Sequence, residues 1–453
     1  MTRAAQERLT GQVYSGVARW LAPSLPWAAL TFALVALAGW PTTPPLVADS
    51  IAYRALALGR ISEVPGSISG RVLHPYFVRF ASWATGLNID QAFLMVALIT
   101  LALLIGTVAW ILRQNTGFGA LVWPLLLTPV LVDEMFGLYY CQDLFYAALL
   151  GCFFVALLKD RKWLALALLL PLYLARESTL LLALVWVALA WLESDFIVVG
   201  ACAAITIVGL FISRKFASLG LPNVHHTNEF VFLALKPPFD SLMNFFGIVL
   251  VPSEMRGKPG YTCSPFAIVH LPRLLSYGST REFGICRFDP RMPLFTFTQW
   301  LSLFGIGPAF LWTLLRHNRR RVLANTPQWL KLATIYGLLY FLIAPAVSEW
   351  IVRDIGYAWP VFWLAAPALF MRFYPAAAPG LIGVLLLENL AACWIPYVLS
   401  LSSSHQGLFS VAALCIALAM QAAALWTLRG KRAMREPRPL VDDESLRTNM
   451  AAY

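Results

Sequence analysis

The chain has 453 residues, of which 59% are hydrophobic and only 13% are charged. Charged residues make up roughly a quarter of an ordinary soluble domain, so the composition excludes that class and indicates a protein embedded in lipid. The formal net charge of +11 could attract nucleic acid, but basic residues of a membrane chain gather in its cytoplasmic loops, and we interpret the charge as a sign of orientation.

Apolar runs recur from one end of the chain to the other, and they predict an all-α polytopic membrane protein forming a single membrane domain, residues 1–453. The first run has no small-residue cleavage site after it, so we expect it to stay as a span. About 12 transmembrane helices are predicted, near residues 24–40, 91–112, 118–132, 143–158, 163–176, 178–192, 196–213, 294–315, 332–347, 355–371, 378–397 and 407–428.

Basic residues outside these spans predict that both termini are cytoplasmic, with residues 429–453 as a cytoplasmic tail. The apolar stretch 163–192 would measure about 45 Å as one helix, which is too long for one upright span. The charge rule favours a hairpin with Arg176–Ser178 at its outer turn. Two large outer segments follow from this topology, residues 41–90 and 214–293.

The first outer segment carries two helical patterns. One apolar stripe runs through Tyr76, Phe80, Trp83 and Leu87 and predicts a helix that lies along the membrane surface. A weaker pattern passes through Ile51, Ala55 and Leu58. In the second outer segment, an oxidising compartment would permit a disulfide between Cys263 and Cys286, but sequence alone leaves this pairing open.

Ionisable residues converge at the predicted outer ends of the spans. Such residues are costly at membrane depth and indicate function, although solvated charges at loop ends are the bland alternative. A carboxylate can take a proton from an attacking hydroxyl, and arginine can neutralise a phosphate leaving group. Together they would suit transfer of a sugar from a lipid phosphate. The set is Asp49, Asp133, Glu134, Asp143, Arg176, Glu177, Glu349, Arg353 and Asp354.

Asp49 is the preferred candidate for the catalytic base, and an N-cap of the following helix is its structural alternative. Arg176 and Glu177 interrupt an apolar stretch, either for substrate binding or as an ion pair that anchors the hairpin turn. Arg353 is a similar candidate, whose charge the neighbouring Asp354 could simply compensate. His74 precedes Pro75 and either opens a helix or hydrogen-bonds an acceptor or phosphate.

No metal-ligand spacing is met by His225, His226, Glu229 and His270, because adjacent histidines point apart. The remaining possibility is a divalent ion shared by Asp49 with Asp133, Glu134 or Asp143, and no cofactor is certain. The sequence contains no nucleotide-phosphate loop, nucleophile elbow or zinc motif. A cytosolic reaction driven by a nucleotide is therefore poorly supported.

The stretch from Ala48 to about Ala97 resembles the first outer loop of the GT-C membrane glycosyltransferases, in particular the bacterial branch related to protein mannosyltransferases and lipid A aminoarabinose transferases. Asp49 matches that family's first aspartate, Tyr53 its tyrosine, and His74 with Pro75 its second motif. Ser50 replaces the glutamate that follows the aspartate in that family, which argues against a role needing two adjacent carboxylates.

The resemblance implies a hexosyl- or pentosyltransferase of the cell inner (plasma) membrane, acting at its periplasmic face with inversion at the sugar. The donor would be a sugar on polyprenyl phosphate, and the acceptor a lipid, a glycan or a protein. Asp49 would be the base, Arg176 or Arg353 would hold the phosphate, and Tyr53, His74 and Glu177 would contact substrate.

Two other classes stay open. A transporter or flippase of lipid-linked saccharides predicts charges at mid-membrane, repeated halves and broken helices, whereas here the charges lie at span ends. A polysaccharide polymerase or ligase would use arginines and histidines of a large late outer loop, and residues 214–291 contain both. An acyltransferase would need a histidine within a span, and all six histidines lie in predicted loops.

Overall fold

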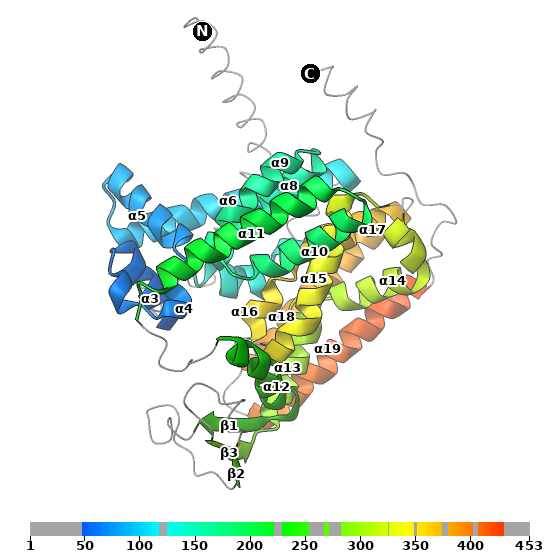
Figure 1. Cartoon of the computed structure of the whole chain (residues 1–453). Coiled ribbons are helices and arrows are strands. Elements are labelled where there is room, and N and C mark those ends of the chain that lie inside the picture. The colour runs from blue at the N-terminus through cyan, green and yellow to red at the C-terminus, as the bar shows by residue number, and fades with distance from the viewer. Residues whose placement is uncertain are drawn as a thin grey trace, which may run out of the picture.

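A computed structural model of the chain describes residues 48–116, 125–221, 229–252, 267–270, 282–324, 326–347, 351–373, 379–401 and 406–429. These residues are predominantly helical, as predicted, with one small antiparallel sheet (Figure 1). The first predicted span, 24–40, lies outside the described residues, and so does the tail from residue 430.

Short helices fill the first predicted outer segment: α3 (Ala48–Ala57), η1 (Ile61–Glu63), α4 (Gly66–Ser69) and α5 (Leu73–Thr85). The two predicted helices are therefore present. On α3, Tyr53 is fully buried while Ile51 is 55% exposed. On α5, Phe80 and Trp83 are 58% and 79% exposed, so the apolar stripe points away from the protein. The helix ends where Gly86 takes a left-handed φ of 73°.

A layer of long helices follows in the chain. It consists of α6 (Ile89–Thr116), α8 (Asp143–Leu158), α9 (Lys162–Ala175), α10 (Thr179–Leu192) and α11 (Phe196–Ala217). In Figure 1, α6, α8, α9 and α11 lie side by side, as their packing contacts require. The chain leaves the helical conformation at Arg176, with φ −161° and ψ 138°. The predicted break between two helices at Arg176–Ser178 is confirmed.

The second half of the chain forms α12 (Glu229–Phe246), α13 (Arg291–Ser302), α14 (Gly307–Ala324), α15 (Gln328–Val347), α18 (Pro379–Leu401) and α19 (Gln406–Arg429). The predicted span 294–315 is interrupted, because α13 and α14 meet at a bend of 65°. Gly305 supplies the bend with a φ of 56°, which a side chain would strain.

Side chains from α18 and α19 satisfy the backbone groups that this bend frees. The N–H of Ile306 donates to Oδ1 of Asn389 at 3.1 Å. Nε2 of Gln421 donates to the carbonyls of Leu301 and Gly305 at 2.8 and 2.6 Å, and its Oε1 accepts from the N–H of Ala309. Lipid offers no hydrogen bonds, so a broken helix at membrane depth needs such partners.

The predicted span 355–371 is also interrupted. It is divided into α16 (Ile351–Gly356), the π-helix η6 (Pro360–Ala365) and α17 (Ala366–Phe373). A second π-helix, η3 (Val130–Phe136), ends the predicted span 118–132. Single π-helical turns occur frequently at functional sites, and α16 carries the candidate residue Arg353.

The sheet lies within the predicted second outer segment. Its strands are β1 (Ile248–Pro252), β2 (Ala267–His270) and β3 (Glu282–Phe288), in the order β1-β3-β2. Both pairings are antiparallel, with Ile248 opposite Phe288 and His270 opposite Glu282. The sheet was not predicted, because its strands are only four to seven residues long and are separated by long connections within the outer segment. Cys286 lies in β3, and Cys263 lies outside the described residues.

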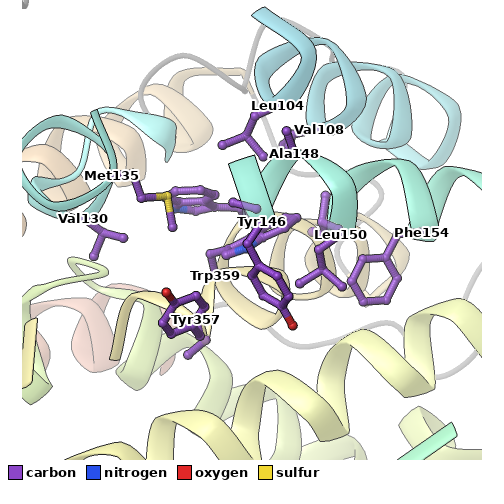
Figure 2. Packing of buried hydrophobic residues seen from close by; sticks show 14 of the residues in the cluster. Leu104, Val108, Val130, Met135, Tyr146, Ala148, Leu150, Phe154, Tyr357 and Trp359 are labelled. Atoms are coloured by element: carbon purple, nitrogen blue, oxygen red, sulfur yellow. The ribbon is translucent and has the colours of Figure 1, made fainter. Parts of the chain in front are cut away.

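A buried aromatic layer joins α8 to the segment around α16 (Figure 2). Figure 2 shows Tyr146 and Phe154 on α8 beside Tyr357 and Trp359. The rings of Tyr146 and Tyr357 are 5.6 Å apart, edge to face, and those of Phe154 and Trp359 are 6.5 Å apart. The hydroxyl oxygens of Tyr146 and Tyr336 lie 3.3 Å apart. Tyr357 connects this layer to Arg176, whose guanidinium carbon lies 4.1 Å from the centroid of its ring.

Five described helices are long and apolar enough to cross a membrane, and the bent pair α13–α14 would make a sixth. The five lie within α6, α11, α15, α18 and α19, while α8, α9 and α10 are apolar but shorter. Large apolar side chains face outward, for example Phe211 at 71% and Trp426 at 76% exposure. These features are compatible with a membrane-spanning helical protein; the prediction of about 12 spans stays a prediction.

Candidate functional site: a cluster of buried arginine–carboxylate pairs

Asp143 is the centre of the candidate site. It is the first residue of α8, and its side chain is 3% exposed. Its Oδ1 accepts a hydrogen bond from Nη1 of Arg176 at 2.6 Å, and its Oδ2 accepts one from Nε of Arg353 at 2.9 Å. A buried carboxylate is tolerated only when it is paired and hydrogen-bonded, and two guanidinium groups meet that requirement here.

Asp49 stands at the rim of this cluster. It lies in the first turn of α3, and its Oδ2 accepts a hydrogen bond from Nη1 of Arg353 at 2.6 Å. The Asp49 side chain is 31% exposed, whereas that of Arg353 is only 7% exposed. The structure thus brings together three of the predicted site residues, Asp49, Arg176 and Arg353, from three distant parts of the sequence.

Asp354 pairs with Arg176 and not with its neighbour Arg353. Its Oδ1 accepts from Nη2 of Arg176 at 2.9 Å. The interpretation that Asp354 compensates Arg353 is therefore wrong, because consecutive residues of a helix point about 100° apart. The Arg176 guanidinium also lies over the ring of Tyr357, 4.1 Å from its centroid, in a cation–π contact.

A second ion pair lies beside the first cluster. Nε of Arg71 donates to Oε2 of Glu177 at 2.8 Å, and Nη2 of Arg71 is paired with Oε1 of the same carboxylate. Nη1 of Arg71 donates to the hydroxyl of Tyr53 at 3.2 Å. Glu177, a predicted substrate-binding residue, thus anchors the α9–α10 turn to the first outer segment through Arg71.

The arginines around Glu177 and Tyr53 affect the protonation of both side chains. Loss of hydration beside Arg71 would raise the pKa of Glu177, but the positive charges of Arg71 and Arg176 outweigh this effect and hold that pKa below its usual range. Burial raises the pKa of the Tyr53 hydroxyl to about 12, against the opposing charges of Arg71 and Arg353. At neutral pH, Glu177 is therefore ionised and Tyr53 is neutral.

His74 lies apart from the hydrogen-bonded cluster. It is in the first turn of α5 and is 1% exposed, between the rings of Phe93 and Phe145 at 5.5 and 5.3 Å. Burial lowers its pKa to about 3, because the attraction of Asp143 only partly offsets the loss of hydration. Among the described residues, its Nδ1 has no hydrogen-bond partner. These contacts favour the helix-opening role over contact with a phosphate.

The carboxylates that the sequence suggested could share a divalent ion bind other side chains in the structure. Arg353 lies between Asp49 and Asp143 and bonds to both. Asp133 hydrogen-bonds Tyr397. Among the described residues, no group of three or more His, Cys, Asp or Glu side chains could hold a metal ion. His225, His226 and Glu349 lie outside the described residues.

Sequence reasoning did not single out two residues of this site. Asp143 was named only among the acids at span ends and as one possible partner of Asp49 around a divalent ion, although an acid that opens an apolar helix indicates a special position. Arg71 is one of several arginines in the first outer segment, and only its pairing with Glu177 and Tyr53 distinguishes it.

No family model matches the chain, and no curated protein matches it. The function therefore has to be argued from the chemistry of the site itself.

Proposed function

We propose that the protein is a membrane glycosyltransferase of the GT-C kind, which moves a sugar from a polyprenyl-phosphate donor to a lipid, glycan or protein acceptor. The observation that supports this is the position of Asp49, a partly exposed carboxylate held through one oxygen by the buried Arg353. Among the described residues, no hydrogen bond reaches its other oxygen, Oδ1. A general base needs this combination of a fixed position and an open lone pair.

In the proposed reaction, Oδ1 of Asp49 takes the proton of the acceptor hydroxyl as the hydroxyl oxygen attacks the sugar. The bond between the sugar and the phosphate oxygen breaks on the opposite face, with inversion, and the phosphate leaves with the electron pair. Arg353 keeps Asp49 in place through the 2.6 Å hydrogen bond. The positive charges near Asp49 stabilise the negative charge that develops on the leaving phosphate.

The proposal includes about 12 spans, with the site at the periplasmic face of the inner membrane. Asp143 begins α8 while Arg176 follows the end of α9, so these two antiparallel helices carry the site at one end. At the opposite ends of the helices, Lys162 pairs with Asp195 at 2.8 Å and Lys331 pairs with Glu193 at 3.1 Å. The turn between α8 and α9, at that opposite end, also carries Lys159 and Arg161, and basic residues mark the cytoplasmic side.

Sugar transfer in proteoliposomes tests the base. Asp49→Asn keeps an oxygen that can accept from Arg353, and we expect it to lower turnover about 100-fold or more with little loss of stability. Glu63→Gln is the matched control, since Glu63 lies in the same outer segment and its side chain is 60% exposed. Full turnover by the Asp49→Asn protein would refute the assignment of the base.

A flippase or transporter of lipid-linked saccharides is the second candidate. The interrupted α13–α14 pair favours it, because broken helices at membrane depth are typical of transporters. Movement of a fluorescent lipid-linked saccharide between leaflets would distinguish the two functions. We expect no such movement, and movement that Asp49→Asn leaves intact would favour the transporter.

A further inference from the structure

The arginines near Asp49 differ in how firmly their carboxylate partners are held. Arg176 and Arg353 both bind Asp143, whose side chain is 3% exposed, so releasing either would leave a buried charge without its partner. Arg71, whose own side chain is 15% exposed, binds Glu177, whose side chain is 57% exposed. Glu177 is the exposed member of this pair, so its carboxylate can turn into water, provided that another anion takes its place on the largely buried Arg71.

The geometry of the Arg71–Glu177 pair suits a phosphate. Nε and Nη2 of Arg71 face the two carboxylate oxygens side by side, which is the two-point arrangement that arginine also makes with two oxygens of a phosphate. The third nitrogen of the same guanidinium is fixed by the Tyr53 hydroxyl. Arg71 is therefore held on one side and carries an exchangeable anion on the other.

Tyr53 connects this pair to the proposed base. Tyr53 and Asp49 both belong to α3 and are four residues apart, so their side chains lie on the same face within about 6 Å of each other at Cβ. The buried Tyr53 hydroxyl accepts from Arg71 and also lies within the field of Arg353, the residue that binds Asp49. A phosphate bound by Arg71 would thus lie beside the carboxylate that activates the acceptor.

We infer that Arg71 binds the phosphate of the lipid carrier, and that the Glu177 carboxylate occupies this position until the phosphate displaces it. The inference rests on the proposed function, because it identifies where that reaction's leaving group binds. It changes the predicted roles of Arg176 and Arg353, which become positioning residues for Asp143 and Asp49. No covalent step is involved, since one anion replaces another on the same guanidinium.

Binding of farnesyl phosphate to the full chain in nanodiscs tests the inference, with farnesol and inorganic phosphate as comparison probes. Arg71→Gln should weaken farnesyl phosphate binding about ten-fold or more and leave farnesol binding unchanged. Arg71→Lys should bind farnesyl phosphate with an affinity between those of the wild type and Arg71→Gln, because lysine keeps the charge but lacks the planar two-point geometry. Glu177→Gln removes the competing anion and should tighten farnesyl phosphate binding about two- to five-fold.

Three results would overturn the inference. They are unchanged farnesyl phosphate binding in Arg71→Gln, weakened binding in Glu177→Gln, and inorganic phosphate binding as tight as that of farnesyl phosphate. Glu177→Gln keeps the test decisive even if Arg71→Gln does not fold, and thermal midpoints report folding. Failure of the proposed function is seen separately, because the wild type would then transfer no sugar while farnesyl phosphate binding still depends on Arg71.

Discussion

Arg353 and Asp49 lie 304 positions apart in the sequence and are joined by a hydrogen bond of 2.6 Å. The same guanidinium bonds to Asp143, so it connects α3, α8 and α16 at one point. One residue therefore fixes the proposed base and also neutralises the buried carboxylate at the centre of the site.

The first prediction concerns the removal of this guanidinium. Arg353→Ala leaves Asp143 buried with one partner fewer, and losing one partner of a buried pair lowers the free energy of unfolding by about 3–5 kcal/mol. We expect a clear fall in the thermal midpoint in detergent, with a smaller fall for Arg353→Lys. Arg60→Ala is the control, since Arg60 is 61% exposed and lies 3.9 Å from its partner Glu63. Equal midpoints for Arg353→Ala and Arg60→Ala would contradict the role of Arg353.

The second prediction compares two aspartates that bind Arg176. Asp143 is 3% exposed and has two arginine partners, whereas Asp354 is 25% exposed. Asp143→Asn should lower the thermal midpoint several-fold more than Asp354→Asn, because it leaves two buried guanidinium groups without their shared anion. It should also lower the turnover number, since Arg353 then lacks one of the groups that orient it toward Asp49. Similar effects of the two substitutions would show that Asp143 is not the centre of the cluster.

The helical breaks show what the sequence could and could not predict. The break at Arg176–Ser178 was predictable because charged residues interrupt an otherwise apolar stretch. The bend at Gly305 was missed although the sequence marks it, because Gly307 and Pro308 form a Gly-Pro pair that favours a turn, while apolar residues on both sides suggested one continuous span. The side chains that satisfy this bend, Asn389 and Gln421, are isolated polar residues of other helices. Only tertiary packing shows what they bind.

For the candidate site, too, the sequence indicated some residues but not their partners. Asp49, Arg176 and Arg353 could be selected because ionisable residues beside apolar spans are rare and costly. The choice of partners could not be predicted, since Asp354 binds Arg176 across 178 positions and not the adjacent Arg353. Arg71 lies in a segment with several other arginines, so its charge alone carried no signal.

The third prediction concerns pH and His74. Its pKa is about 3 in the folded protein and roughly 6.5 when unfolded, so between these values the unfolded chain binds more protons. Stability should therefore fall as pH falls from about 6.5 toward 3, by up to about 1.4 kcal/mol per pH unit. His74→Leu removes this titration and keeps an apolar side chain between Phe93 and Phe145.

Thermal midpoints at pH 7 and pH 5 measure the effect of His74. Between pH 7 and pH 5 the wild type should lose more unfolding free energy than His74→Leu, by about 2 kcal/mol. A substitution at Glu177 cannot mimic this result, because the pKa of Glu177 is lowered and its contribution is lost only below about pH 4. An equal loss of stability between pH 7 and pH 5 in the wild type and in His74→Leu would show that His74 is not buried as a neutral group.

The fourth prediction tests the bend between α13 and α14. Gly305 has a φ of 56°, and a Cβ added there would lie 2.3 Å from Oδ1 of Asn389 and 2.5 Å from its backbone oxygen. Gly305→Ala should therefore lower the thermal midpoint strongly, because the backbone of α18 cannot move aside easily. Gly383→Ala on the same α18 is the matched control, since nothing lies within 4 Å of a Cβ at that position and alanine favours a helix.

Gln421→Leu removes the side chain that satisfies the same bend. The carbonyls of Leu301 and Gly305 and the N–H of Ala309 then lose a partner, and each unsatisfied buried group costs about 1–3 kcal/mol. We expect Gln421→Leu to lower the midpoint although it makes α19 more apolar. If the bend instead straightened into one continuous span, the freed groups would pair within the helix. Gln421→Leu would then be neutral, and cysteine pairs placed across the bend would report a longer separation.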